Sequence, residues 1–164
     1  MRRSIPIEPL TREGFAPYGD LVDAADASPI TINQGFAQRF DGLADIDVMA
    51  QGGMVNISLF VAQPRPLPIE IALMERHPLG AQLFAPMQDR PWLVVACDDP
   101  CNFDSYRAFR ATGRQGVNYA RNVWHHPLLV LDPDSLFLVV DRKGPESNLE
   151  EYELDAAARL ALEP

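Results

Sequence analysis

Proline is spread through this chain, and its distribution limits the folds that the chain can adopt. Fifteen of the 164 residues are proline. Each proline inside a helix costs about 3 kcal/mol relative to alanine, so a helical bundle is disfavoured. Short strands separated by turns accommodate prolines at their ends and edges. The sequence therefore predicts an all-β fold, a sandwich or a barrel, with a few short helices.

Apolar segments of strand length or with a two-residue period recur along the chain. Strands are expected at residues 55–61, 69–77, 92–97, 128–131 and 136–140. The last two are expected to form a hairpin around the turn at 132–135. The segment 69–77 also contains helix-favouring residues, but its period and its flanking prolines favour a strand.

Two helices are expected beside these strands. Thr11 is a suitable N-cap for a short helix over 11–15. The tail from Glu153 to Leu162 is rich in alanine and leucine, which predicts a terminal helix.

Length, charge and cysteine content restrict the class of protein. No linker or repeat divides the chain, so a single domain over 1–164 is expected. The net charge of −9 argues against nucleic acid or an anionic membrane as the partner. No apolar run approaches ~18 residues, and no signal peptide is visible. Cys97 and Cys101 have no second cysteine pair and form no zinc site, so a cytoplasmic protein with reduced thiols is expected.

The three histidines lie in two polar clusters, at residues 75–82 and 115–128. If 69–77 is one strand, alternation places Glu75 and His77 on the same face as its isoleucines. An apolar face that ends in a carboxylate and an imidazole is typical of the mouth of a barrel, a common ligand site. In the second cluster, alternation places Arg121, Val123 and His125 on one face and Asn122, Trp124 and His126 on the other, so one of the two histidines should point inward and the other outward. Tyr119 is expected to be a core residue rather than a substrate platform.

Several long motifs resemble the ureidoglycolate lyase family, formerly called ureidoglycolate hydrolases. They lie at residues 15–20, 62–64, 75–82, 115–119, 121–128 and 141–142, so the likeness extends over nearly the whole chain. The resemblance implies a cupin-like β-barrel (a double-stranded β-helix or jelly roll) that is usually a homodimer. It also implies cleavage of ureidoglycolate into glyoxylate and urea in purine (allantoin) breakdown.

The chemistry of the reaction that the resemblance implies suggests roles for particular residues. His77, His125 and Glu75 are expected to be catalytic. The same three residues and Gln82 occupy the ligand positions of degenerate cupin metal motifs, so no cofactor is certain and a divalent ion such as nickel stays an open alternative. Substrate contacts are expected from seven residues, with Arg121 on the carboxylate: Arg121, Asn118, Asn122, Gln82, His126, Asp141 and Arg142.

Two other functions fit the same residues. The chain could be a metal-dependent cupin oxygenase or isomerase that acts on another small carboxylic acid. It could also be a non-catalytic barrel that binds a small ligand. An assay for urea released from ureidoglycolate distinguishes these hypotheses.

Overall fold

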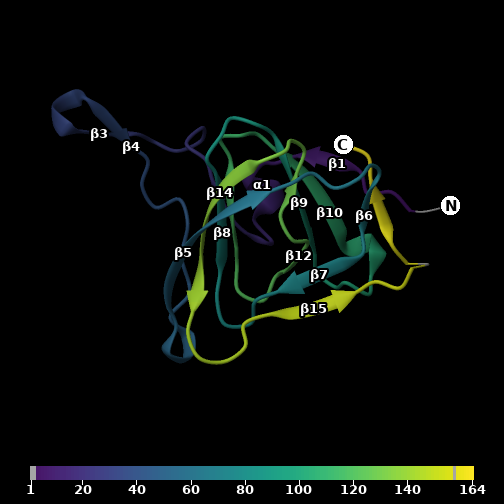
Figure 1. Cartoon of the computed structure of the whole chain (residues 1–164). Coiled ribbons are helices and arrows are strands. Elements are labelled where there is room, and N and C mark those ends of the chain that lie inside the picture. Colours follow the sequence, from purple (N-terminus) through teal and green to yellow (C-terminus); the bar gives the residue numbers. More distant parts are fainter. Residues whose placement is uncertain (1–2, 157) are drawn as a thin grey trace.

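Two β-sheets face one another in the structure, a computed structural model that describes residues 3–156 and 158–164 (Figure 1). The larger sheet has the strand order β1 (Ile7–Pro9), β10 (Tyr106–Ala111), β9 (Trp92–Cys97), β12 (Trp124–His125), β7 (Leu73–Arg76) and β15 (Glu150–Glu153), with β13 (Leu129–Val130) also paired to β9. The smaller sheet has the order β2 (Gly19–Val22), β11 (Gly116–Tyr119), β8 (Gln82–Pro86), β14 (Ser135–Lys143) and β5 (Met54–Ala62).

Two further ribbons and four short helices complete the described elements. One ribbon pairs β6 (Ile69–Ile71) with β16 (Leu160–Leu162), and the other pairs β3 (Ile30–Ile32) with β4 (Ala37–Arg39). The helices are α1 (Arg12–Phe15), η1 (Asn33–Gly35), η2 (Ala50–Gly52) and η3 (Phe103–Ser105). No helix in the described part of the chain has the length and apolar character needed to cross a membrane.

The core has two layers because β9 is buried on both faces. Between the two sheets, Trp92 and Val94 pack with Phe84, Val117 and other side chains from the smaller sheet. On the opposite side of β9, a second apolar cluster packs against the β6–β16 ribbon. The seven-stranded sheet is therefore the middle layer, and its inner face holds the candidate site.

The all-β prediction is confirmed, although the sheets do not close into a barrel. Thr11 caps α1 as predicted, since its hydroxyl accepts a hydrogen bond from the backbone N–H of Gly14 (3.1 Å). The predicted strands at 55–61 and 92–97 form as β5 and β9.

The prediction of one strand over 69–77 is wrong. The strand is interrupted at Ala72, between β6 and β7. The carbonyl of Ala72 accepts a hydrogen bond from the N–H of Leu154. Beyond the break, Met74 joins the same apolar cluster as Ile69 and Ile71. The phase of the alternation has therefore shifted by one residue, and Glu75 points between the sheets while the two isoleucines point to the other layer.

Two predictions near the C-terminus are also wrong. The segments on either side of the turn at 132–135 do not form a hairpin, because β13 pairs with β9 while β14 pairs with β5 and β8 in the other sheet. The tail expected to be a helix forms parts of β15 and β16, with residue 157 outside the described residues. Leu160 and Leu162 are buried against β6, so tertiary pairing overrides helix propensity here.

Candidate active site

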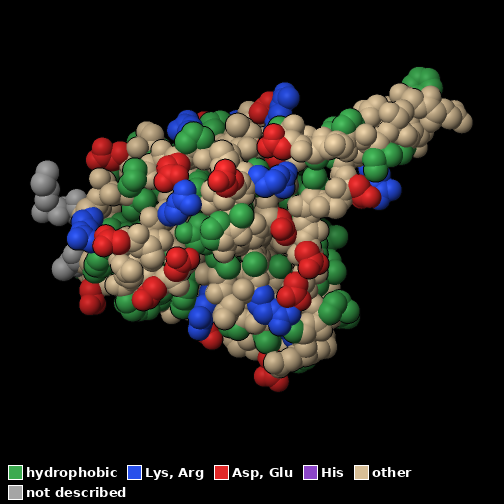
Figure 2. Space-filling view, turned by 180° about the vertical axis from the view of Figure 1, so that it is seen from behind, with side chains coloured by type: hydrophobic (Ala, Val, Ile, Leu, Met, Phe, Trp, Pro, Cys, Tyr) green, Lys and Arg blue, Asp and Glu red, His purple; other side chains and the backbone are tan. Residues whose placement is uncertain are grey.

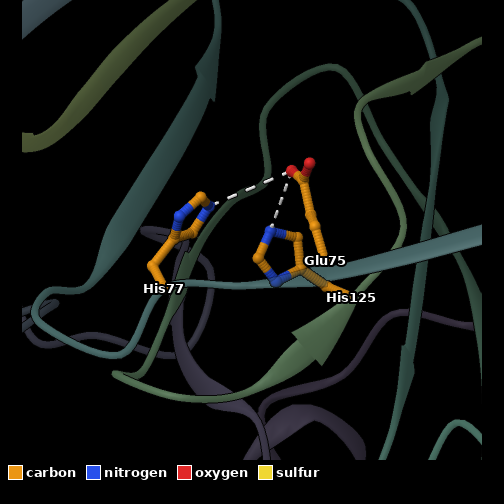
Figure 3. A group of neighbouring side chains, drawn as sticks. All are labelled: Glu75, His77 and His125. Carbon is orange, nitrogen blue, oxygen red and sulfur yellow. Dashed lines mark ion pairs between the residues drawn. The ribbon is translucent and has the colours of Figure 1, made fainter. Parts of the chain in front are cut away.

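Three polar side chains converge between the two sheets. Glu75 on β7 and His125 on β12 lie directly opposite one another in the antiparallel pair, and His77 follows β7 by one residue. The Nε2 atom of His125 lies 3.4 Å from Oε1 of Glu75, and Nε2 of His77 lies 3.9 Å from the same oxygen (Figure 3). These three residues are called the triad below.

Gln82 reaches the triad from the opposite sheet, at the start of β8. Its amide oxygen lies 3.1 Å from Nε2 of His77 and 3.3 Å from Nε2 of His125. The four residues expected to be metal ligands are therefore neighbours, although they come from both sheets and from segments far apart in the sequence.

Backbone carbonyls fix the orientation of both triad histidines. Nδ1 of His77 lies 2.7 Å from the carbonyl oxygen of Asn148, and Nδ1 of His125 lies 2.9 Å from that of Val123. A carbonyl oxygen only accepts, so each Nδ1 carries the hydrogen. In a neutral ring, Nε2 then has a lone pair directed toward the oxygens of Glu75 and Gln82. The lone pair on each Nε2 and these side-chain oxygens repel one another. A cation between them, either a proton on Nε2 or a metal ion, removes this repulsion.

The triad is screened from water but not sealed. The side chain of His125 is 1% exposed, whereas those of Glu75 and His77 are 16% and 14% exposed. Burial pushes the pKa of Glu75 upward, but the hydrogen bond from His125 and the charges of the histidines together hold it below its ordinary value. Glu75 is therefore a carboxylate at neutral pH and can stabilise a positive charge on either ring.

Two neighbours of the triad were not predicted as site residues. The Tyr119 ring stacks on His125, with ring centroids 4.0 Å apart and planes 14° apart, and burial raises the pKa of its hydroxyl. The expectation that Tyr119 lies in the core is correct, and its ring also packs against the imidazole of His125. Asn148 supplies the carbonyl for His77, and its side chain accepts a hydrogen bond from the N–H of Leu79 (2.6 Å).

Arg121 precedes His125 by four residues in the sequence, and its guanidinium forms an ion pair with Asp47. Its Nε and Nη2 atoms bind both carboxylate oxygens of Asp47, at 3.0 and 2.6 Å. Asp47 in turn accepts a hydrogen bond at its backbone carbonyl from the N–H of Ala81, and the N–H of Asn122 donates to the carbonyl of His77. Arg121 and Asn122 do not alternate on a strand as expected, because β12 begins only at Trp124 and Asn122 has a φ of 70°.

Asn118 lies away from the triad. In the antiparallel pair of β11 and β8, Asn118 lies opposite Leu83, and its neighbour Tyr119 lies opposite Gln82. The side-chain amide of Asn118 donates to the carboxylate of Asp20 (3.0 Å) and to the backbone carbonyl of Asp45 (2.8 Å). It lines a cavity of about 380 Å³ together with Arg121 and those two aspartates. Its amide oxygen is buried and has no hydrogen-bond partner. The structure thus does not bring Asn118 together with the triad.

Alternation predicted that one of His125 and His126 points outward, but both are buried. The backbone N–H of His126 donates to Val95, and its Nδ1 lies 2.7 Å from the carbonyl oxygen of Pro127. Burial lowers the pKa of His126 to about 4, although the contact with Pro127 acts in the opposite direction. His126 is therefore a neutral ring next to the triad at neutral pH.

Asp141 and Arg142 lie within β14, on opposite faces. Asp141 accepts a hydrogen bond from the Asn56 amide (2.8 Å) on the side that faces the other sheet. Arg142 is buried on the outer side, where its guanidinium donates to the carbonyls of Ala50 (3.1 Å) and Gln51 (3.3 Å). Arg142 therefore stabilises the η2 turn through these backbone carbonyls, and it does not lie between the sheets with the triad.

The triad also has the chemistry of a metal site. One ligand atom from each member lies within 4.8 Å of the other two. Two imidazoles and a carboxylate suit a first-row divalent ion. The carbonyl held by each Nδ1–H is the outer partner that metal-binding histidines usually have. The residues present therefore fit a divalent ion, and Gln82 would be a fourth oxygen donor.

The chain is similar to known proteins over nearly its whole length. The family model described as "Ureidoglycolate lyase" matches residues 2–161. The chain is 51% identical over 158 residues to ureidoglycolate lyase 1 of Rhizobium meliloti (strain 1021), which covers 96% of this chain and 93% of that protein. It is 51% identical over 160 residues to the ureidoglycolate lyase of Burkholderia cepacia, covering 96% and 90%. The corresponding Brucella ovis protein is 48% identical over 150 residues, covering 91% and 89%. The chain therefore belongs to the ureidoglycolate lyase family.

Proposed function

We propose that the triad and Gln82 cleave ureidoglycolate into glyoxylate and urea. Membership of a lyase family makes the protein an enzyme of this class. The observation that supports a role for the triad is the convergence of two imidazoles with fixed tautomers on one ionised carboxylate. Such an arrangement moves protons near neutral pH.

The reaction needs two proton transfers around one carbon–nitrogen bond. Ureidoglycolate carries a hydroxyl and a urea nitrogen on the same carbon. A base takes the hydroxyl proton as the carbonyl of glyoxylate forms, and the electrons of the broken carbon–nitrogen bond pass to nitrogen. An acid then protonates that nitrogen and urea leaves. His77 and His125 supply these two functions, and Glu75 stabilises the imidazolium that forms.

Arg121 is the proposed partner of the substrate carboxylate. Its planar guanidinium already holds a carboxylate with two hydrogen bonds, that of Asp47, and such bidentate pairing is characteristic of arginine. Asn122, the next residue, is hydrogen-bonded through its backbone to His77. Substrate would therefore exchange with Asp47 beside the triad, while Gln82 and Asn122 provide amide groups for the urea portion.

A divalent ion such as nickel would be held by Glu75, His77 and His125, with Gln82 nearby. When bound, such an ion polarises a substrate oxygen and makes a hydroxyl more acidic. The protein's own contribution is to orient both imidazoles through Nδ1, to keep Glu75 ionised and to limit access of water through the burial of His125.

A metal-dependent oxygenase is the second candidate function. Two histidines and one carboxylate are also the ligand set of non-haem iron oxygenases, and the triad has this composition. Metal analysis separates the two hypotheses, because the oxygenase requires stoichiometric iron and consumes oxygen. A protein that releases urea without oxygen consumption is the lyase.

The setting of the enzyme follows from the same proposal. We expect a homodimer in the cytoplasm that acts late in purine (allantoin) breakdown, where ureidoglycolate is consumed. Light scattering, fractionation and growth on allantoin after gene deletion test these three expectations separately.

The decisive experiment measures urea released from ureidoglycolate by the purified protein, above the spontaneous rate. The arginine assignment is tested by Arg121→Lys, with Arg76→Lys as its matched control. Arg76 also forms a half-exposed pair with a carboxylate, that of Glu150, but it has no proposed contact with substrate. Urea release no faster than the spontaneous rate would contradict the proposed function and favour a ligand-binding protein.

A further inference from the structure

A cavity of about 440 Å³ lies at the end of the molecule marked C in Figure 1. Its walls come from the segment before β6, from the start of β6, from β10 and from the chain around β13. Two of its described lining residues are arginines, and the others are apolar. The argument uses Arg65, Arg110, Leu67, Ile69, Val130 and Leu131. The cavity contains no member of the triad and is called the arginine cavity below.

The two arginines of this cavity have no partner in the described part of the chain, since neither guanidinium forms a hydrogen bond or an ion pair there. Every other arginine that the structure describes is paired with a carboxylate or donates to a backbone carbonyl. The chain has 23 acidic and 14 basic side chains, so acidic partners are plentiful. On the face drawn in Figure 2, blue basic side chains lie among red acidic ones. The arginine cavity therefore collects two positive charges that the described chain leaves unpaired.

A neighbouring cavity of about 570 Å³ shows the contrast. It shares Arg110 and Pro164 with the arginine cavity, but Glu8, Asp89 and Glu163 also line it. These three carboxylates disfavour an anion there. Among the described residues, neither arginine of the arginine cavity forms an ion pair with the end of the chain at Pro164. An anion is therefore favoured on the side of Arg110 that faces Arg65 and the apolar walls.

We propose that the arginine cavity binds a small organic anion, a carboxylate attached to an apolar body. A guanidinium presents parallel N–H groups that match the two oxygens of a carboxylate. The cavity has the volume of a small-molecule site, which is roughly 300–1,000 Å³. The triad and the proposed lyase reaction play no part in this inference.

The walls explain why the ligand needs an apolar body as well as a charge. Arg65 and Arg110 are both exposed, and an exposed ion pair alone contributes little to affinity. Ile69 and Val130 form a buried apolar floor, whereas Leu67 is 71% exposed. A ligand that covers Leu67 removes apolar surface from water, which adds affinity to the ion pairs. A free inorganic anion contacts the arginines and leaves this surface uncovered.

Benzoate is the probe that tests the proposal, because it joins one carboxylate to a flat apolar ring. Its binding to the purified protein is followed by NMR, from the shifts of backbone amides. The expected Kd is on the order of 1 mM, with the shifts centred on residues 64–69, 110 and 130–131. Benzamide has the same shape without the charge, and acetate has the charge with almost no apolar body. Each should bind at least about tenfold more weakly than benzoate.

Charge-matched variants separate the cavity from the overall charge of the protein. Arg65→Gln and Arg110→Gln should each raise the Kd of benzoate about 3- to 10-fold, and the double variant should raise it further. The control is the double variant Arg114→Gln with Lys143→Gln, which loses the same charge at two exposed residues outside the cavity. It should keep the Kd within twofold of the wild type.

Three results would overturn the proposal. They are a wild-type Kd in the double arginine variant, benzamide binding as tightly as benzoate, and shifts centred on the triad instead of the arginine cavity. The amide spectrum of each variant shows in the same experiment that its fold is retained. Urea release is not a readout here, so failure of the proposed function leaves this test unaffected.

Discussion

Replacement of Glu75 by glutamine removes the negative charge of the triad and keeps its shape. In the structure, one carboxylate oxygen of Glu75 faces Nε2 of both His125 and His77. Glutamine retains an oxygen that can accept from either ring. The change therefore isolates the charge, whose proposed task is to stabilise whichever histidine has taken the substrate proton.

The expected loss follows from the contact that the charge makes. Nε2 of His125 lies 3.4 Å from the carboxylate oxygen, and a hydrogen bond to a charged group contributes about 1.5–3 kcal/mol. At about 1.4 kcal/mol per tenfold, kcat should fall roughly 10- to 150-fold. The imidazolium develops during the reaction and not on substrate binding, so KM should change little.

The assay measures kcat and KM for urea release by the wild type, Glu75→Gln and a control, Glu151→Gln. Glu151 is exposed and lies opposite Glu75 on β15, so it tests a nearby charge outside the site. Bound divalent metal is measured in each sample, which distinguishes loss of an ion from loss of the charge. A kcat for Glu75→Gln within twofold of the wild type would refute the role of the carboxylate.

The remaining predictions concern the other site residues and the thiols. His77→Ala and His125→Ala should each lower kcat at least about a hundredfold. Near-normal turnover in both variants would mean that these residues have only a structural role. Arg121→Lys should lower kcat/KM about 10- to 150-fold, mostly through KM, because lysine lacks the planar fork; a wild-type value would leave another arginine as the carboxylate's partner. Burial raises the pKa of the Cys97 thiol to about 12, whereas Cys101 is exposed, so a thiol reagent at pH 8 should label Cys101 rapidly and Cys97 only on unfolding. Mass spectrometry of the labelled protein identifies the residue, and rapid labelling at Cys97 would contradict its burial.

Much of the fold follows from local patterns that the sequence contains. The strand at 92–97 is a continuous apolar run, and β9 is buried on both faces as such a run predicts. Thr11 caps its helix for a purely local reason, the reach of its hydroxyl to the N–H of Gly14. These elements were predictable because the groups that determine them lie within a few residues of one another.

The errors in the fold arise where a distant segment decides the outcome. A two-residue period continues through 69–77, yet a hydrogen bond from Leu154 to the carbonyl of Ala72 accompanies a change of phase. The alanine- and leucine-rich tail favours a helix in isolation, but β6 offers Leu160 and Leu162 a buried strand partner. No local pattern reports a partner that lies more than 80 residues away in the sequence.

The same distinction applies to the site. Glu75 and His77 lie two residues apart, so alternation alone places them on one face, and the motif resemblance adds His125 and Gln82. No sequence pattern identified Asn148, because it contacts His77 through its backbone carbonyl and lies 71 residues away in the sequence. The partners of Arg121 also come from a distant loop, where Asp47 occupies its guanidinium.

The position of the hydrogen on each triad ring links the fold to the proposed chemistry. The backbone carbonyl of Asn148 and that of Val123 each take the Nδ1 hydrogen of one histidine, so both Nε2 atoms face the same space. Oxygens from Glu75 and Gln82 face that space too. A cation in this space, a proton or a divalent ion, is therefore attracted by the whole group, and a proton received by one ring is held by groups from both sheets. The core packed between the two sheets sets the distance from Gln82 on one sheet to the two imidazoles on the other side, and under the proposed mechanism this distance affects how strongly the site binds the transferred proton.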